Sequence, residues 1–318
     1  MDGFALLLHY FSQVFAIGLS SIGGSIGQGF AVSTALKAMD RQSLGVEHIF
    51  KSMIIGLALI ETGSILALVL TLLLLFGNQG AITLNMSIAQ LGITLSIGIA
   101  ASAVGLASSF AVRGASESIS RQPFFSQKIL IIQVIIQSII ESPALFAFII
   151  GILIFNQITP NLLFFDAIRL LAAGLTIGLG SIGPSLGQAI FAKTACESIA
   201  VNKQAYSKLF SFALLCETII ETPVIFCLLI SFMLLFSSRS NHAIVSIASM
   251  LAAAFTISVG IIGPSIAMGR VTAQSCAQIV KNQELYPLIL RTTFMAAGFI
   301  DSSAIYALVV ALILVVSM

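Results

Sequence analysis

The amino-acid sequence predicts an all-α membrane protein in which eight transmembrane helices form four tandem helical hairpins. Hydrophobic residues make up 58% and charged residues 8% of the 318 residues, whereas a soluble domain carries about 25% charged residues. Eight apolar stretches are long enough to span a bilayer, which takes about 20 residues. Alternate stretches each carry one acid at intervals of 80 residues: Glu61, Glu141, Glu221 and Asp301.

The apolar stretches come in pairs, one pair in each repeat. Because a fixed period indicates repeated structural units, we expect the units 1–80, 81–160, 161–240 and 241–318. The first stretch lacks a preceding basic segment and a clear cleavage site, so we interpret it as a helix and not as a removed signal peptide. The expected spans are 5–36 and 50–76, 86–112 and 129–155, 162–192 and 209–236, and 243–269 and 287–317.

Basic residues cluster at the predicted turn within each hairpin. Twelve of the 14 lysines and arginines lie in or near four segments, and Arg169 and Arg239 are the exceptions. Basic loops stay in the cytoplasm, so we expect these turns there and both chain termini on the outside. The four segments are 37–51, 113–128, 193–208 and 270–291.

No motif in the sequence indicates a catalytic site. The four cysteines and three histidines lack metal-ligand spacing, and the cysteines are interpreted as small packing residues. A phosphate-binding loop and a basic surface with aromatic residues for nucleic acid are also missing. We therefore expect no catalytic residue, no cofactor and no nucleic-acid partner.

Small residues recur at every fourth position of the first helix of each repeat, as at Gly23, Gly27 and Ala31. This spacing places them on one helix face, where small side chains let helices approach closely in a membrane. We expect the four first helices to pack side by side in a tight cylinder. Phe191 and Val271 interrupt the stripe, and we expect looser contacts at these two residues.

The four acids lie in the middle of apolar stretches, where a charged side chain costs about 2.5–3.5 kcal/mol and usually has a function. Gln28 and Gln188 are expected at the depths of Glu61 and Glu221, because the members of each pair are equally far from the hairpin turn. Carboxylate, amide and hydroxyl oxygens suit a hard cation. A hydroxyl side chain follows each acid: Thr62, Ser142, Thr222 and Ser302.

Proline follows the hydroxyl residue in repeats 2 and 3, at Pro143 and Pro223. Proline has no N–H, so the carbonyl four residues earlier loses its helical partner. In repeat 3 this carbonyl belongs to Ile219, which would add a fourth oxygen at the depth of the acid. The alternative is that Thr222 hydrogen-bonds back to its own helix.

With these features, the chain resembles the c subunit, the proteolipid of F-type rotary ATP synthases, four times along nearly its whole length. That family has a hairpin with a first helix rich in glycine and alanine, a polar turn and a carboxylate in the second helix. Arg121-Gln122-Pro123 matches the turn, and the segment 115–119 resembles the approach to it. The resemblance implies that the turns contact the central stalk through Arg41, Gln42, Arg121, Gln122, Pro123, Asn202 and Asn282.

Sodium-binding members of this family pair a glutamine on the first helix with a glutamate followed by serine or threonine on the second. Repeat 3 matches this pattern, and repeat 1 matches it apart from Gly24 in the place of a proline. The resemblance implies that neighbouring hairpins share each site and that the Ile219 carbonyl is a ligand. The implied Na⁺ sites are Gln28/Glu61/Thr62 and Gln188/Glu221/Thr222.

Repeats 2 and 4 depart from the sodium pattern, because Ser108 and Met268 stand in the place of the glutamine. Repeat 4 also has Asp301 for glutamate, although Tyr306 occupies the position of a tyrosine that supports the acid in the family. Gln137 and Glu217 lie one helical turn before an acid, and we expect them either to supplement the site or to face an aqueous path. No role is assigned to Arg270.

The resemblance implies a homo-oligomeric ring that turns in membrane lipid against the a subunit of the stator and carries Na⁺ or H⁺ on its carboxylates. Ion flow would then be coupled to ATP synthesis or hydrolysis in a soluble head, and the chain itself would not be an enzyme. We expect it in the bacterial inner membrane.

Two other functions remain open. A vacuolar-type proteolipid of an ATP-driven ion pump is also made by hairpin fusion, but the four retained acids and the Arg-Gln-Pro turn favour the F-type. A self-contained channel or secondary transporter is the other alternative. Such transporters often use inverted repeats, whereas the repeats of this chain are parallel.

Overall fold

The computed structural model describes residues 3–77, 82–237 and 243–317, which are helical apart from short connections. Eight helical rods in these ranges are long and apolar enough to cross a membrane. This confirms the predicted all-α class and the integral membrane character. Each of the eight is one arm of a hairpin. In each of repeats 2 to 4, one arm is divided into two consecutive helices.

The hairpins follow one another along the chain in the order of the repeats. Hairpin 1 consists of α1 (Gly3–Arg41) and α2 (Val46–Gly77), and hairpin 2 of α3 (Leu84–Arg121), α4 (Ser126–Ile140) and α5 (Ser142–Gln157). Hairpin 3 consists of α6 (Phe164–Gly180), α7 (Ile182–Ile199) and α8 (Tyr206–Phe236). Hairpin 4 consists of α9 (Ala243–Gly260), α10 (Ile262–Lys281) and α11 (Tyr286–Val316).

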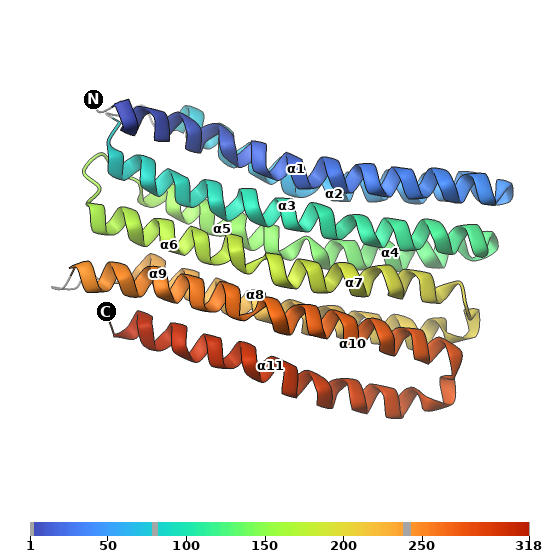
Figure 1. Ribbon diagram of the computed structural model, residues 1–318. Helices are drawn as coiled ribbons and strands as arrows, with labels where there is room; N and C mark the ends of the chain where they lie inside the picture. Colours follow the sequence, from blue (N-terminus) through green and yellow to red (C-terminus); the bar gives the residue numbers. More distant parts are fainter. Residues whose placement is uncertain (1–2, 78–81, 238–242, 318) are drawn as a thin grey trace.

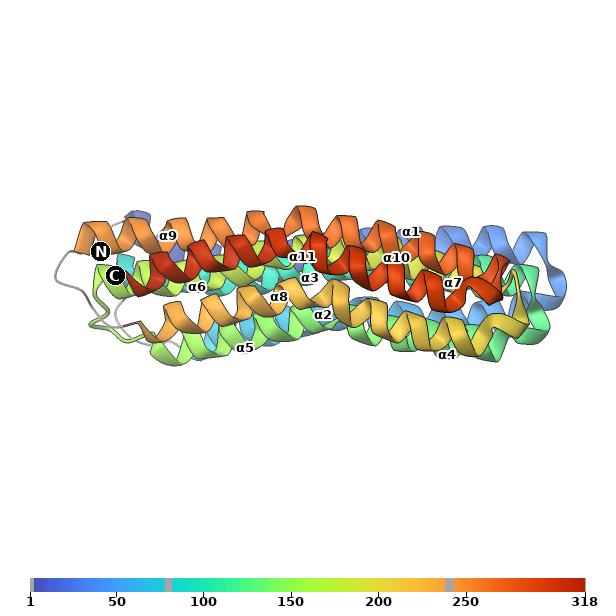
Figure 2. The same cartoon turned by 90° about the horizontal axis from the view of Figure 1, so that it is seen from below.

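The first arms of the hairpins lie side by side in one layer, formed by α1, α3, α6–α7 and α9–α10 (Figure 1). The second arms α2, α4–α5 and α8 cover one face of this layer (Figure 2). Each of these second arms packs against the first arms of its own hairpin and of the following hairpin. The last arm, α11, lies along the edge of the bundle against α9 and α10.

Both ends of the chain lie at the same end of the bundle, opposite the four hairpin turns (Figures 1 and 2). The first arms are longer than the predicted spans, since α1 continues to Arg41 and α3 to Arg121. With a rise of 1.5 Å per residue, the 39 residues of α1 extend over about 58 Å. That is about twice the thickness of the hydrocarbon core, so the arms project beyond it.

Three predicted spans are interrupted by a single residue that is not part of the flanking helices: Glu141, Ser181 and Ile261. A proline follows two or three residues later in each case, at Pro143, Pro184 and Pro264. Because proline removes a backbone donor and crowds the preceding turn, the regular hydrogen bonding stops there. In contrast, α8 runs through Pro223 without interruption.

Glycines bring the backbones of the first arms into contact, as the small-residue stripe predicted. A Cβ atom on Gly183 would lie 2.7 Å from the Cα of Ile262, and one on Gly105 would lie 3.0 Å from the Cα of Gly24. Phe191 is fully buried in the core, and the looser contact expected at this residue stays a prediction. Val271 does line an open groove between α10 and α11.

Candidate ion-binding sites

The four acids lie at the same level of the second arms. Glu61, Glu221 and Asp301 each follow the first residue of their helix by 15 residues, and Glu141 follows the start of α4 by the same number. This distance corresponds to about 22 Å along the helix from the turn. Their surroundings differ, since Glu61 is exposed, Glu221 and Asp301 are half-buried, and Glu141 is only 7% exposed.

A hydroxyl of repeat 1 contacts the acid of repeat 2. The Thr62 hydroxyl lies 2.6 Å from Oε2 of Glu141 and 2.7 Å from the carbonyl oxygen of Leu59. The hydroxyl has one hydrogen, so it can donate to either acceptor but not to both. Thr62 thus contacts the acid of the next repeat, although Glu61 is its neighbour in the sequence.

At the next junction Ser142 lies beside Glu221 but does not hydrogen-bond to it. The hydroxyl of Ser142 is buried without a hydrogen bond. In the last two repeats the hydroxyls turn back to their own helices, as the alternative for Thr222 predicted. Thr222 donates to the carbonyl of Thr218 at 3.0 Å, and Ser302 donates to the carbonyl of Phe299 at 2.6 Å.

The two glutamines of the predicted sodium sites lie in different surroundings. Gln188 is fully buried and lies beside Glu217, one helical turn before Glu221. Gln28 is half-buried on α1, and no hydrogen bond in the described part of the chain joins it to Glu61. Among the described residues, no hydrogen bond joins Gln188 to Glu221 either.

The acid of repeat 4 has no side-chain hydrogen bond among residues 243–317. Met268 is fully buried at the position of the glutamine, and Oδ1 of Asp301 is buried without a hydrogen bond. Tyr306 is 67% exposed, and among residues 243–317 no hydrogen bond joins it to Asp301. Ile219, the predicted carbonyl ligand of repeat 3, is half-buried on α8.

A buried amide network, which the sequence did not reveal in full, ties repeat 1 to repeat 2. The side-chain amide of Gln137 donates to the hydroxyl of Ser108 at 2.9 Å and to the carbonyl of Gly56 at 3.2 Å. Gln133 donates to Gln137 at 3.0 Å and accepts from Ser52. The signal in the sequence was two glutamines four residues apart in an apolar helix, since this spacing places both on one face.

The four predicted stalk-contacting turns share one backbone conformation. Each turn contains a residue with φ between −148° and −138° that precedes a short 3₁₀ helix: Gln42, Gln122, Asn202 and Asn282. Asn202 and Asn282 accept a hydrogen bond from the backbone two residues later, at 3.0 and 3.1 Å. Arg41 and Arg121 are exposed at the ends of α1 and α3, and Pro123 opens the second turn.

The chemistry of these sites is that of one carboxylate among neutral oxygens. Within residues 3–77, 82–237 and 243–317, no group of three or more His, Cys, Asp or Glu residues could hold a metal ion. A single carboxylate with amide, hydroxyl and carbonyl oxygens can hold one proton or one hard monovalent cation and become neutral. Neutrality lets such a group lie in lipid at low cost.

A known protein family matches each of the four hairpins. The family model for the C subunit of ATP synthase matches residues 12–74, 91–154, 171–234 and 251–314. The ATP synthase c subunit 2 of Cereibacter sphaeroides is 44% identical over 64 residues, which are 20% of this chain and 77% of that protein. The ATP synthase c subunit of Dehalococcoides mccartyi is 42% identical over 71 residues, which are 22% of this chain and 93% of that protein. The ATP synthase c subunit of Prochlorococcus marinus is 40% identical over 73 residues, or 23% and 90%.

Proposed function

The chain belongs to the family of ATP synthase C subunits, and from this premise we propose that it is the ion-carrying rotor component of a rotary ATP synthase. Four hairpins on one chain would supply four carboxylates to a ring. The chain is a non-catalytic membrane component, and its relatives are named ATP synthase subunit c. Its working sites lie between the proposed units 1–80, 81–160, 161–240 and 241–318.

The contact between Thr62 and Glu141 carries this proposal, because it joins the hydroxyl of one repeat to the acid of the next. Three junctions of this kind fall within one chain, and the hydroxyl–acid hydrogen bond is formed at the first of them. The fourth would pair Ser302 with Glu61, which belong to the last and the first hairpin. Glu61 is exposed, and a second copy of the chain placed after hairpin 4 would cover it.

Two glycines without contacts support assembly with a second copy. Gly263 occupies the position of Gly183, and Gly29 occupies the position of Gly269. Gly183 and Gly269 pack closely on neighbouring backbone, whereas nothing lies within 4 Å of a Cβ placed on Gly263 or Gly29. The two open faces are therefore complementary halves of the junction that the chain repeats internally.

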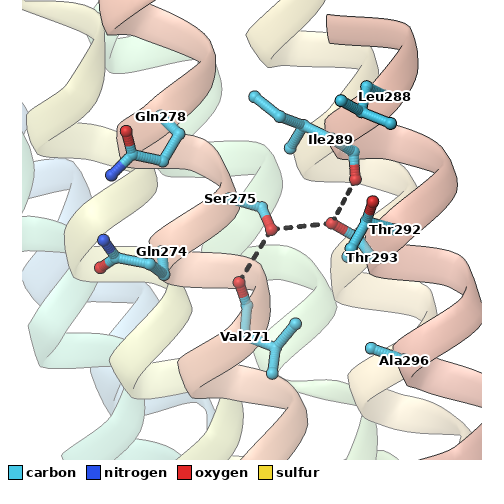
Figure 3. Close-up of a pocket in the computed structure, with 9 residues that line it drawn as sticks. All are labelled: Val271, Gln274, Ser275, Gln278, Leu288, Ile289, Thr292, Thr293 and Ala296. Atoms are coloured by element: carbon cyan, nitrogen blue, oxygen red, sulfur yellow. Dashed lines mark hydrogen bonds between the residues drawn. The ribbon is translucent and has the colours of Figure 1, made fainter. Parts of the chain in front are cut away.

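A groove between α10 and α11 marks the same open face (Figure 3). Ser275, Thr292 and Ala296 in its lining correspond by register to Ala35, Ser52 and Gly56 of repeat 1. Those three residues are buried. In the groove, Ser275 and Thr293 hydrogen-bond to each other at 2.7 Å. We infer that hairpin 1 of a second copy fills this groove.

Heterologous contacts of this kind close into a ring when the rotation permits, and a ring of identical chains contains a multiple of four hairpins. Each carboxylate would exchange its ion at the a subunit of the stator and cross the lipid in the occupied, neutral form. One elementary charge crossing the membrane contributes about 2.3 kcal/mol per 100 mV. The hairpin turns would face the cytoplasm of a bacterial inner membrane and contact the central stalk.

We favour Na⁺ over H⁺ as the carried ion, because repeats 1 and 3 contain both the glutamine and the glutamate with its following threonine. Carbodiimide labelling of the four acids, followed site by site with mass spectrometry, tests this assignment. Sodium at neutral pH is expected to protect Glu61 and Glu221. Protection of neither acid would exclude Na⁺ at these sites and leave H⁺ as the carried ion.

Native mass spectrometry of the complex in mild detergent tests the ring. Closed oligomers with a whole number of chains are expected. A monomeric chain under conditions that preserve other membrane rings would contradict the proposed assembly.

A further inference from the structure

Glu217 is a second carboxyl in repeat 3, one helical turn before Glu221 on α8. Its side chain is fully buried, and neither of its carboxyl oxygens has a hydrogen-bond partner. Buried polar groups in proteins are almost always paired. The proposed function assigns no role to this residue, so its position requires an explanation.

The Gln188 amide lies beside the Glu217 carboxyl. Gln188 is also fully buried, and neither its amide oxygen nor its amide nitrogen has a hydrogen bond. Ser185, three residues earlier on α7, is buried with an unpaired hydroxyl as well. Polar side-chain atoms on α7 and α8 are therefore buried here without a hydrogen bond.

Repeat 2 shows that this position need not be left unpaired. Gln137 stands where Glu217 stands in repeat 3, and Ser108 stands where Gln188 stands. The Gln137 amide donates to the hydroxyl of Ser108 and to the carbonyl of Gly56. The side chains at these two positions are therefore hydrogen-bonded in repeat 2 and buried without a hydrogen bond in repeat 3.

We propose that Glu217 is an additional ligand of the repeat 3 cation site, together with Gln188 and Glu221. This site would bind a monovalent cation such as Na⁺ more tightly than the one-carboxylate site around Glu141. The inference rests on the proposed function, since it assumes that Glu221 carries a cation. Side chains four residues apart on a helix are neighbours, so both carboxyls attract a cation held between α7 and α8. Two carboxylates and one monovalent cation leave a charge of −1, so the occupied site also holds one proton and is neutral in lipid.

The test compares Glu217→Gln with the unaltered chain in assembled rings. The sodium concentration that protects half of Glu221 from carbodiimide is measured by mass spectrometry, and Glu61 in the same chain serves as the reference. Removing one of two nearby negative charges should raise this concentration about tenfold or more. The concentration for Glu61 should not change.

Gln137→Glu is the reciprocal variant, because it places the second carboxyl in repeat 2. It should lower the sodium concentration that protects half of Glu141. If Glu217→Gln does not assemble, this variant alone tests whether a second carboxyl tightens sodium binding. An unchanged value at Glu221 in Glu217→Gln, with Glu61 still protected, would overturn the additional ligand and leave the proposed function intact. Absence of sodium protection at all four acids in the unaltered chain would overturn the sodium assignment itself and this inference with it.

Discussion

The junction between repeats 1 and 2 is closed within the chain, whereas the matching faces of repeats 4 and 1 are open. In the closed junction, Gly23 packs on the backbone of Ser102 and Thr62 contacts Glu141. On the open face, Gly263 meets nothing within 4 Å and Ser302 bonds only to its own helix. Equivalent residues of repeats 1 and 4 therefore make different contacts, because another hairpin follows repeat 1 in the chain and none follows repeat 4 within the described residues.

The junction between repeats 3 and 4 lies between these two cases. Its first arms are closed, since Gly187 packs on the backbone of Ser265. Its second arms have not made the hydroxyl contact, because Thr222 still bonds to Thr218. The first arms are therefore in close contact at all three junctions, whereas the hydroxyl–acid hydrogen bond is formed at the junction between repeats 1 and 2.

Gly23→Val should have the largest effect, because it acts on a closed junction. The new side chain would overlap the backbone of Ser102, which cannot move aside without separating α1 from α3. Overpacking a core usually costs about 1–3 kcal/mol, and we expect the upper end or more where backbone is the obstacle. Thermal unfolding in detergent, followed by circular dichroism, measures this loss.

Gly298→Val is the matched control, because nothing lies within 4 Å of a Cβ placed on Gly298. This variant should unfold at the temperature of the unaltered chain. Equal unfolding temperatures for Gly23→Val and the unaltered chain would show that the first arms are not held together by this close contact.

Gly263→Val should have a smaller effect on the chain and a specific effect on assembly. Its side chain has room within the monomer, so the unfolding temperature of the isolated chain should change little. In a ring it would meet the first arm of the next copy, as Gly183 meets Ile262. Native mass spectrometry should therefore show single chains, and intact rings would mean that this face is not a junction.

The period of 80 residues and the small-residue stripe predict the hairpins and the close packing of their first arms. They do not predict which acid Thr62 contacts, because the hydroxyl is adjacent to Glu61 in sequence and reaches Glu141 only through the stagger of packed helices. The exposure of the acids could not be predicted either. Glu61 and Glu141 occupy the same place in their repeats, but only Glu141 has hairpins on both sides.

Thr62→Ala and Ser302→Ala should have the smallest effects and separate the two kinds of junction. A hydrogen bond to a charged group contributes about 1.5–3 kcal/mol, so loss of the donor should raise the sodium concentration that protects the partner acid about tenfold. For Thr62→Ala the partner is Glu141, and the change should persist in single chains that carry Gly263→Val. For Ser302→Ala the partner is Glu61 of the next copy, so the change should occur in rings and vanish in single chains. A contrary result would be that Thr62→Ala raises the sodium concentration that protects Glu61 and leaves the concentration for Glu141 unchanged. Each site would then belong to one repeat, and the open faces would have no part in ion binding.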